Sequence, residues 1–125
     1  MALFPSTVIN FHAVYDEKWM DSIFSLLKRI YQIVPVSALE AHYYEGRKLR
    51  HACHITFDDG DESFYHTVFP LLVKHQMSVS IYVSPKAAKE RTNFWFQEIR
   101  DYDRQKMLSV INDRLSLPRP ISDIT

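Results

Sequence analysis

The amino-acid sequence predicts an α/β fold, a partial (β/α) barrel in which about four parallel strands are flanked by outer helices. Four short apolar segments have the composition of strands: residues 7–12, 33–36, 52–58 and 79–83. Segments with apolar residues at helical spacing separate them, and strands that alternate with helices pair in parallel through right-handed crossovers. A closed barrel of this kind takes about 250 residues. The 125 residues are therefore expected to form one domain equivalent to about half of a barrel.

The first strand and the first helix are predicted within residues 7–30. Residues 7–12, Thr-Val-Ile-Asn-Phe-His, are rich in β-branched and aromatic side chains, as in a buried strand. Asp16 follows as a helix N-cap, because its carboxylate can accept a hydrogen bond from the first helical turn. From Trp19 to Ile30 apolar residues recur at helical spacing with charged residues between them. This pattern predicts an amphipathic helix.

A second strand and helix are expected within residues 33–46. Residues 33–36, Ile-Val-Pro-Val, indicate a short strand. Residues 37–40, Ser-Ala-Leu-Glu, have the capping-box pattern, in which the Ser and Glu side chains each accept a hydrogen bond from an orphan N–H at a helix start. The helix should end at Gly46, since glycine readily adopts the left-handed conformation that terminates helices.

The third strand, residues 52–58, has the clearest two-sided pattern. Because side chains alternate along a strand, two sets of three residues should point to opposite faces. One set comprises Cys53, Ile55 and Phe57, and the other comprises His54, Thr56 and Asp58. We expect the first set to face the helices.

The remaining elements follow a turn at Gly60. Pro70 can occupy the first position of a helix, where its missing N–H costs nothing. A fourth strand is expected at residues 79–83 and a helix over residues 93–115, with Trp95 and Ile99 among its apolar anchors. Prolines at 118 and 120 end that pattern, so residues 116–125 are predicted to be a loose tail.

Composition and charge restrict the class of protein. Lys and Arg together number 15, as do Asp and Glu, so no net charge attracts nucleic acid or an anionic membrane. No apolar run approaches the roughly 18 residues of a membrane span. The first residues lack the basic and apolar regions of a secretory signal, and Cys53 is the only cysteine. We therefore expect a reduced, cytoplasmic protein without a disulfide.

Polar residues at two strand ends indicate a site. His12 ends the first strand, and Asp58 and Asp59 end the third; chemistry in parallel sheets gathers at these carboxyl ends. One carboxylate can bind a cation while the other acts as a base on water. A second interpretation is that Asp-Asp-Gly simply forms a turn.

The segment 55–60, Ile-Thr-Phe-Asp-Asp-Gly, closely resembles the first motif of the polysaccharide deacetylases, carbohydrate esterase family four. Three flanking segments agree in order. Residues 8–12 resemble the family's opening strand, an apolar run ending in an aromatic residue and His. Residues 69–75 resemble its amphipathic helix, and residues 79–83 its next strand. The chain thus resembles the N-terminal portion of such a barrel domain.

This resemblance implies a metal-dependent hydrolase that removes N-acetyl groups from a polysaccharide or other glycan. Asp58 would be the general base, and Asp59 would bind a divalent metal, with zinc as the expected ion. Thr56 shares the face of Asp58 and is expected to support the site. His12 either assists the site or binds substrate, or is a hydrogen-bonded structural histidine.

Part of the family's site has no counterpart in this sequence. The family completes its metal site with a later His-Ser/Thr-x-x-His segment, which is absent here, as is its Leu-x-His general acid. The nearest imitation, His51 and His54, has the wrong spacing, and on a strand these side chains point to opposite faces. We therefore expect a fragment with weak activity or none. Its exposed strand edges would permit self-association.

Two other functions remain open. The chain could be a non-catalytic remnant of the fold that binds glycan or a partner, or a small magnesium-binding domain like a receiver. Among the other histidines, His54 is interpreted as a satisfied core residue. Three are expected on helix surfaces: His42, His66 and His75.

Overall fold

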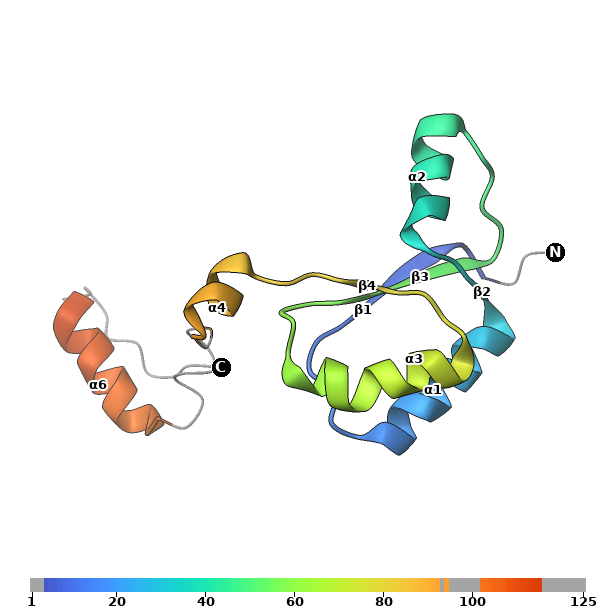
Figure 1. Cartoon of the computed structure of the whole chain (residues 1–125). Helices are drawn as coiled ribbons and strands as arrows, with labels where there is room; N and C mark the ends of the chain where they lie inside the picture. Colours follow the sequence, from blue (N-terminus) through green and yellow to red (C-terminus); the bar gives the residue numbers. More distant parts are fainter. Residues whose placement is uncertain (1–3, 93, 95–101, 116–125) are drawn as a thin grey trace. The chain divides into compact units, whose positions relative to one another are not determined.

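The computed structural model describes residues 4–92, 94 and 102–115. The chain divides into two compact units, Met1–Pro85 and Lys86–Thr125, and each is described by itself. The first unit contains the sheet and the helices that cover it (Figure 1). The described helices include none long and apolar enough to cross a membrane.

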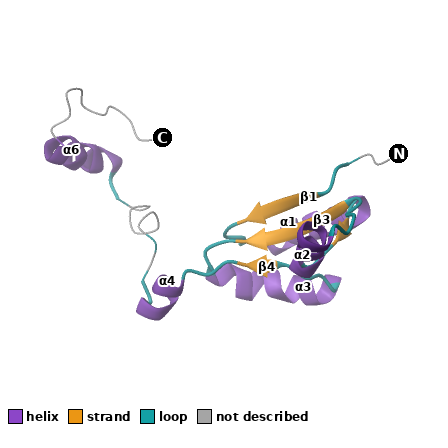
Figure 2. Ribbon diagram, turned by 90° about the horizontal axis from the view of Figure 1, so that it is seen from above, coloured by secondary structure: helices purple, strands orange, loops and turns teal. Residues whose placement is uncertain are grey.

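The sheet has four strands, and all of its pairings are parallel, as predicted. Its strands are β1 (Thr7–Phe11), β2 (Gln32–Ile33), β3 (Ala52–Phe57) and β4 (Ser80–Ile81). β3 is central, and Figure 2 shows it between β1 and β4. β1 pairs with β3 over its length, β2 pairs with the beginning of β3 and β4 with its end. Because β1 occupies one edge of β3, β2 and β4 share the other. Over the described residues the sheet is open, so the predicted barrel is present only as a parallel α/β sheet.

Two helical segments cover one face of this sheet. α1 (Glu17–Ile30) begins as predicted, because the Asp16 carboxylate accepts a hydrogen bond from the backbone N–H of Trp19 at 2.9 Å. α3 (Phe69–His75) follows a π-helical turn, η1 (Phe64–Val68). Pro70 lies in the first turn of α3, as expected, but helical backbone already precedes it. A proline interrupts the regular helical hydrogen bonds, which accounts for the wide turn before it.

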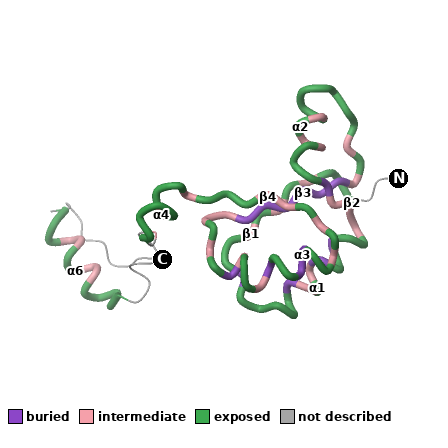
Figure 3. Tube along the Cα trace, in the orientation of Figure 1, coloured by how far each residue is buried: buried purple, intermediate pink, exposed green. Residues whose placement is uncertain are grey.

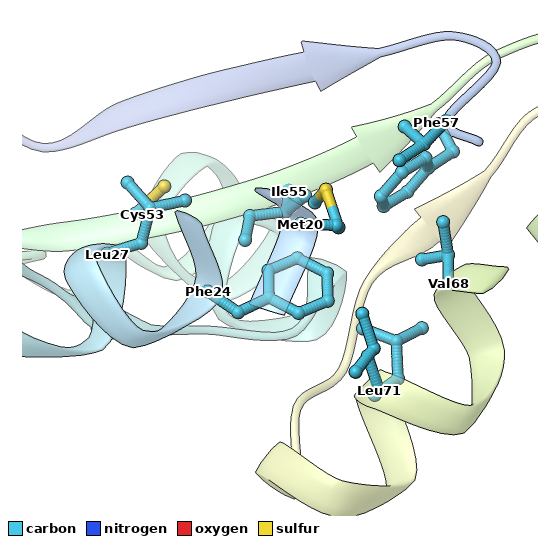
Figure 4. Packing of buried hydrophobic residues seen from close by; sticks show 10 residues of the cluster. Met20, Phe24, Leu27, Cys53, Ile55, Phe57, Val68 and Leu71 are labelled. Atoms are coloured by element: carbon cyan, nitrogen blue, oxygen red, sulfur yellow. The ribbon is translucent and has the colours of Figure 1, made fainter. Parts of the chain in front are cut away.

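The hydrophobic core lies between β3 and these helices (Figure 4). The inward set of β3 is as predicted: Cys53, Ile55 and Phe57 are each at most 1% exposed. They contact buried side chains of α1 and of the η1–α3 segment: Met20, Phe24, Leu27, Val68, Leu71 and Leu72. Each large side chain buried in this way contributes roughly 1.5–3 kcal/mol. Burial also raises the pKa of the Cys53 thiol, so the thiol stays protonated at neutral pH.

α2 (Val36–Glu45) differs from the prediction at its start. The N-cap is Pro35, without a side-chain hydrogen bond, and the helix begins before Ser37. The predicted capping box is therefore wrong, because Pro35 already holds the extended conformation of a cap and places Ser37 inside the first turn. This early start also shortens β2, since Val36 is helical. The end at Gly46 is as predicted, with φ of 70°. α2 has no buried residue (Figure 3).

The later elements are shorter than expected. β4 covers only Ser80–Ile81 of the predicted 79–83, although Tyr82 N–H continues the pairing by donating to the Phe57 carbonyl at 2.8 Å. Pro85 begins α4 (Pro85–Glu90).

In the second unit the predicted helix over 93–115 is present as α6 (Arg104–Leu115). Phe94, Tyr102 and Asp103 are not helical. One continuous helix is therefore wrong, because the Asp103 carboxylate accepts from the N–H of Lys106 at 3.0 Å and so caps a new helix. Trp95, Ile99 and the tail 116–125 lie outside the described residues.

Candidate active site

The loops that follow β1 and β3 meet at the carboxyl edge of the sheet. Asp58 N–H donates to the Phe11 carbonyl at 2.9 Å, which holds the two strand ends side by side. His12 follows β1 directly, and Asp58 and Asp59 follow β3. Parallel pairing thus brings together residues that are 46 or 47 positions apart, because both strands run toward the same edge.

His12 lies close to both carboxylates. Its Nδ1 is 3.3 Å from Asp59 Oδ2, and its Nε2 is 4.0 Å from Asp58 Oδ2. The side chains are 65% exposed for His12, 33% for Asp58 and 29% for Asp59. Exposed ion pairs of this kind contribute little to stability, commonly below about 1 kcal/mol. The grouping therefore contributes little to holding the fold together.

Two successive residues of the turn have left-handed backbone. Asp59 has φ of 70° and Gly60 φ of 67°, and Gly60 N–H donates to the Asp58 carbonyl at 2.9 Å. Such a conformation costs a non-glycine residue about 1–3 kcal/mol, and it concentrates at functional sites. At Gly60 a Cβ atom would lie 3.1 Å from a methyl carbon of Val83. The turn that brings Asp59 to His12 therefore needs glycine at position 60.

Asp58 has a second partner on β1, which the sequence analysis did not identify. Asn10 Nδ2 donates to Asp58 Oδ2 at 2.8 Å, and Thr56 Oγ1 donates to Asn10 Oδ1 at 2.8 Å. Thr56, expected to support the site, is only 6% exposed and reaches Asp58 through Asn10. The available signal was a polar residue within an apolar strand, two positions before His12 and hence on the same face.

Further hydrogen bonds tie the two site loops together. Ser63 Oγ accepts from the backbone N–H of Val14 at 2.9 Å, and Ser63 is 2% exposed. Tyr15 OH donates to Asp61 Oδ1 at 3.2 Å, and the same oxygen accepts from Ser63 N–H at 2.9 Å. These contacts set the distance between His12 and the acidic pair.

The other histidines have structural partners. His54 is 2% exposed, and its ring nitrogens lie 2.8 Å from the Val34 carbonyl and 2.9 Å from Ser80 Oγ. The interpretation as a satisfied core residue is confirmed, and this ring bridges the gap between β2 and β4. His42 is exposed, as expected. The surface prediction is wrong for His75, whose side chain is 12% exposed because it binds Asp21 and contacts Phe24.

The donor set does not complete a metal site. No group of three or more His, Cys, Asp or Glu side chains placed to hold a metal ion occurs in the described ranges. A zinc site normally has at least three protein ligands. His12 and Asp59 are two side chains that could reach one ion, so the described residues do not fit a complete centre.

No known sequence family matches the chain, and no curated protein matches it. Solved structures do share its fold. IcaB from Ammonifex degensii has a TM-score of 0.59 and 23% identity over 63% of this chain and 38% of that chain. A de-N-acetylase from Aggregatibacter actinomycetemcomitans has a TM-score of 0.55 and 20% identity over 61% of this chain and 36% of that chain.

A third similar structure is Streptococcus pyogenes deacetylase PplD in complex with acetate. It has a TM-score of 0.52 and 16% identity over 78% of this chain and 51% of that chain. The matched part of the chain thus has a fold of the polysaccharide deacetylase type. The chain spans between about a third and a half of the length of these proteins.

Proposed function

We propose that the chain carries the acidic pair of a metal-dependent hydrolase that removes N-acetyl groups from a glycan. One observation carries the proposal. Asp58 and Asp59, with His12 between them, stand at the carboxyl edge of a parallel sheet whose fold is shared with a de-N-acetylase and a deacetylase. Catalytic residues of α/β folds collect at this edge.

Asp58 is proposed as the general base. In hydrolysis of an acetamido group, the oxygen of water bonds to the carbonyl carbon, the C–N bond breaks, and acetate and an amine leave. The water loses a proton in forming the new bond, and the leaving nitrogen gains one. A positioned base typically contributes about 10²–10⁴ in rate to such a step. His12, beside both carboxylates, supports the pair.

Asp59 is proposed as a ligand to a divalent metal, with zinc as the proposed ion. His12 Nδ1, 3.3 Å from Asp59 Oδ2, is the nearest described nitrogen ligand that could share the ion. When bound, the metal would supply Lewis-acid polarisation of the acetamido carbonyl. Two ligands hold zinc poorly compared with three or four. The 125-residue chain alone should therefore bind metal weakly and release acetate slowly or not at all.

The open sheet also supports a proposal about partners. β1 pairs with β3 only, over the described part of the sheet, so the outer edge of β1 is available to another strand. Val8 on this strand is 54% exposed. Unpaired edges with exposed apolar residues favour association between chains. We expect self-association at this edge, with an N-acetylated glycan as the small partner.

A non-catalytic, glycan- or partner-binding form of the same fold is the second candidate. The incomplete donor set favours it for this chain. The two candidates differ in what Asp58 and Asp59 do, because a binding module needs neither a base nor a metal.

The test combines elemental analysis of bound zinc with acetate release from an N-acetylglucosamine oligomer. Asp59→Asn should reduce zinc affinity about tenfold or more, because it removes a charged ligand. Asp58→Asn should retain the metal. In a longer protein that contains this chain and supplies the missing ligands, the Asp58→Asn substitution should lower turnover by about 10²-fold or more. Asp113→Asn on α6, an exposed carboxylate, is the matched control.

Two outcomes would contradict the proposal. Glycan binding that survives both substitutions, without zinc or acetate release in any form, would establish the binding module instead. Full activity from the 125-residue chain would mean that its own histidines complete the centre, contrary to the ligand set described above.

A further inference from the structure

A line of hydrogen bonds crosses the face of the sheet opposite α1 and α3, from Thr56 through Asn10 to Asp58. Asn10 and Thr56 are register partners on β1 and β3, and their side chains lie on the face opposite the helices. Thr56 donates to Asn10, and Asn10 donates to Asp58, each at 2.8 Å. We propose that Asn10 is a positioning residue that holds the Asp58 carboxylate in one orientation. That this orientation serves catalysis rests on the function proposed above.

Asp58 and Thr56 together hold the Asn10 amide in one orientation. The hydroxyl of Thr56 donates to the amide oxygen, which leaves the amide nitrogen facing the carboxylate. A rotated amide would place its oxygen against Asp58, bringing two acceptors together, and would lose the hydrogen bond to that carboxylate. Thr56 is β-branched and 6% exposed, so its own side chain has little rotational freedom. The line of hydrogen bonds therefore starts at Thr56, a buried side chain that rotates little.

The line engages only one oxygen of Asp58. Oδ2 accepts from Asn10 and is also the oxygen nearest His12 Nε2, at 4.0 Å. No residue in the described part of the chain donates a hydrogen bond to Oδ1. An aspartate side chain can exchange between staggered χ1 rotamers when nothing holds its carboxylate. Asn10 thus fixes the group while leaving one oxygen able to accept a proton.

Asp59 provides a contrast that matches the two proposed roles. Its carboxylate contacts His12 Nδ1 at 3.3 Å, and that ring is 65% exposed. A base must be oriented by the protein before the reaction. The sheet supplies that orientation to Asp58 and not to Asp59.

The first test measures the side-chain rotamer of Asp58 by three-bond NMR couplings in the full chain. We expect a single χ1 rotamer in the wild type and averaged couplings in Asn10→Leu and Asn10→Asp, which lack the amide donor. Thr56→Val should also average the couplings, and Thr56→Ser, which keeps the hydroxyl, should restore one rotamer. Thr7→Val makes the same chemical change elsewhere on the sheet and should leave the couplings unchanged. Averaged couplings in the wild type, or a single rotamer that persists in Asn10→Leu, would overturn the proposal.

The second test measures acetate release from an N-acetylglucosamine oligomer, with the same substitutions made in a longer protein that contains this chain and supplies the missing ligands. Asn10→Leu should lower kcat about tenfold and change KM less than twofold, because a misdirected base affects the chemical step more than binding. An unchanged kcat overturns the positioning role. If the unsubstituted longer protein releases no acetate while the rotamer results hold, Asn10 still orients Asp58 and the proposed function alone fails.

Discussion

Replacing Gly60 by alanine tests how the turn delivers Asp59 to the site. The substitution meets two separate obstacles. The first is the backbone, because φ of 67° costs an L-residue about 1–2 kcal/mol. The second is Val83, whose two methyl carbons lie 3.1 and 3.2 Å from the new Cβ. Carbon atoms prefer about 3.5–4.0 Å, so the side chain of Val83 must move.

The structure offers a control that separates these costs. Gly46 has nearly the same φ, 70°, but a Cβ there meets nothing within 4 Å. Gly46→Ala should therefore show the backbone cost alone, about 1–2 kcal/mol. Val83 is 51% exposed and can yield, so its contact should add about 1 kcal/mol, the low end for overpacking. We expect Gly60→Ala to lose about 2–3 kcal/mol in total.

The assay is urea unfolding followed by circular dichroism. Gly60→Ala combined with Val83→Ala should recover about 1 kcal/mol relative to the additive sum, since the contact is removed while the backbone cost remains. Zinc affinity should fall in Gly60→Ala, because the turn carries Asp59, and should not change in Gly46→Ala. Equal losses from the two glycine substitutions, with no recovery from Val83→Ala, would refute this reasoning.

The remaining predictions concern contacts between distant segments. Hydrogen bonds from Lys74 and then His75 hold the pKa of Asp21 below its ordinary value of 3.8; the stability that they provide is present above that value and is lost as pH falls through the lower, folded pKa. Lowering the pH below about 4 should therefore reduce the urea midpoint of the wild type more than that of Asp21→Asn. Equal reductions in the two proteins would mean that Asp21 is not the source of this stability. Replacing His54 by leucine leaves a buried carbonyl and the Ser80 hydroxyl without their partner, and should cost about 2–4 kcal/mol; a loss below about 1 kcal/mol would mean that water replaces the ring.

Local pattern in the sequence was sufficient for much of the fold. The alternation along β3 identified which side chains enter the core, because the period of two is a property of any strand. Asp16 and Gly46 identified helix ends, since capping depends on the residue at the end itself. The same reasoning put His12 and the acidic pair at strand ends, and the six-residue motif suggested the deacetylase fold.

Only the tertiary structure decided the contacts that depend on register. Nothing local to Asn10 shows that it lies opposite Thr56, 46 residues away, or that it donates to Asp58. His75 is partly buried because Asp21, 54 residues away, binds it. Pro35 is the N-cap of α2, so the capping box expected at Ser37 does not form. A strand or helix is stabilised by neighbours in sequence, whereas the orientation of a carboxylate depends on which strands meet and in what register. The sequence by itself therefore determined the elements and the acidic pair, and the packing of β1 against β3 determined the partners of that pair.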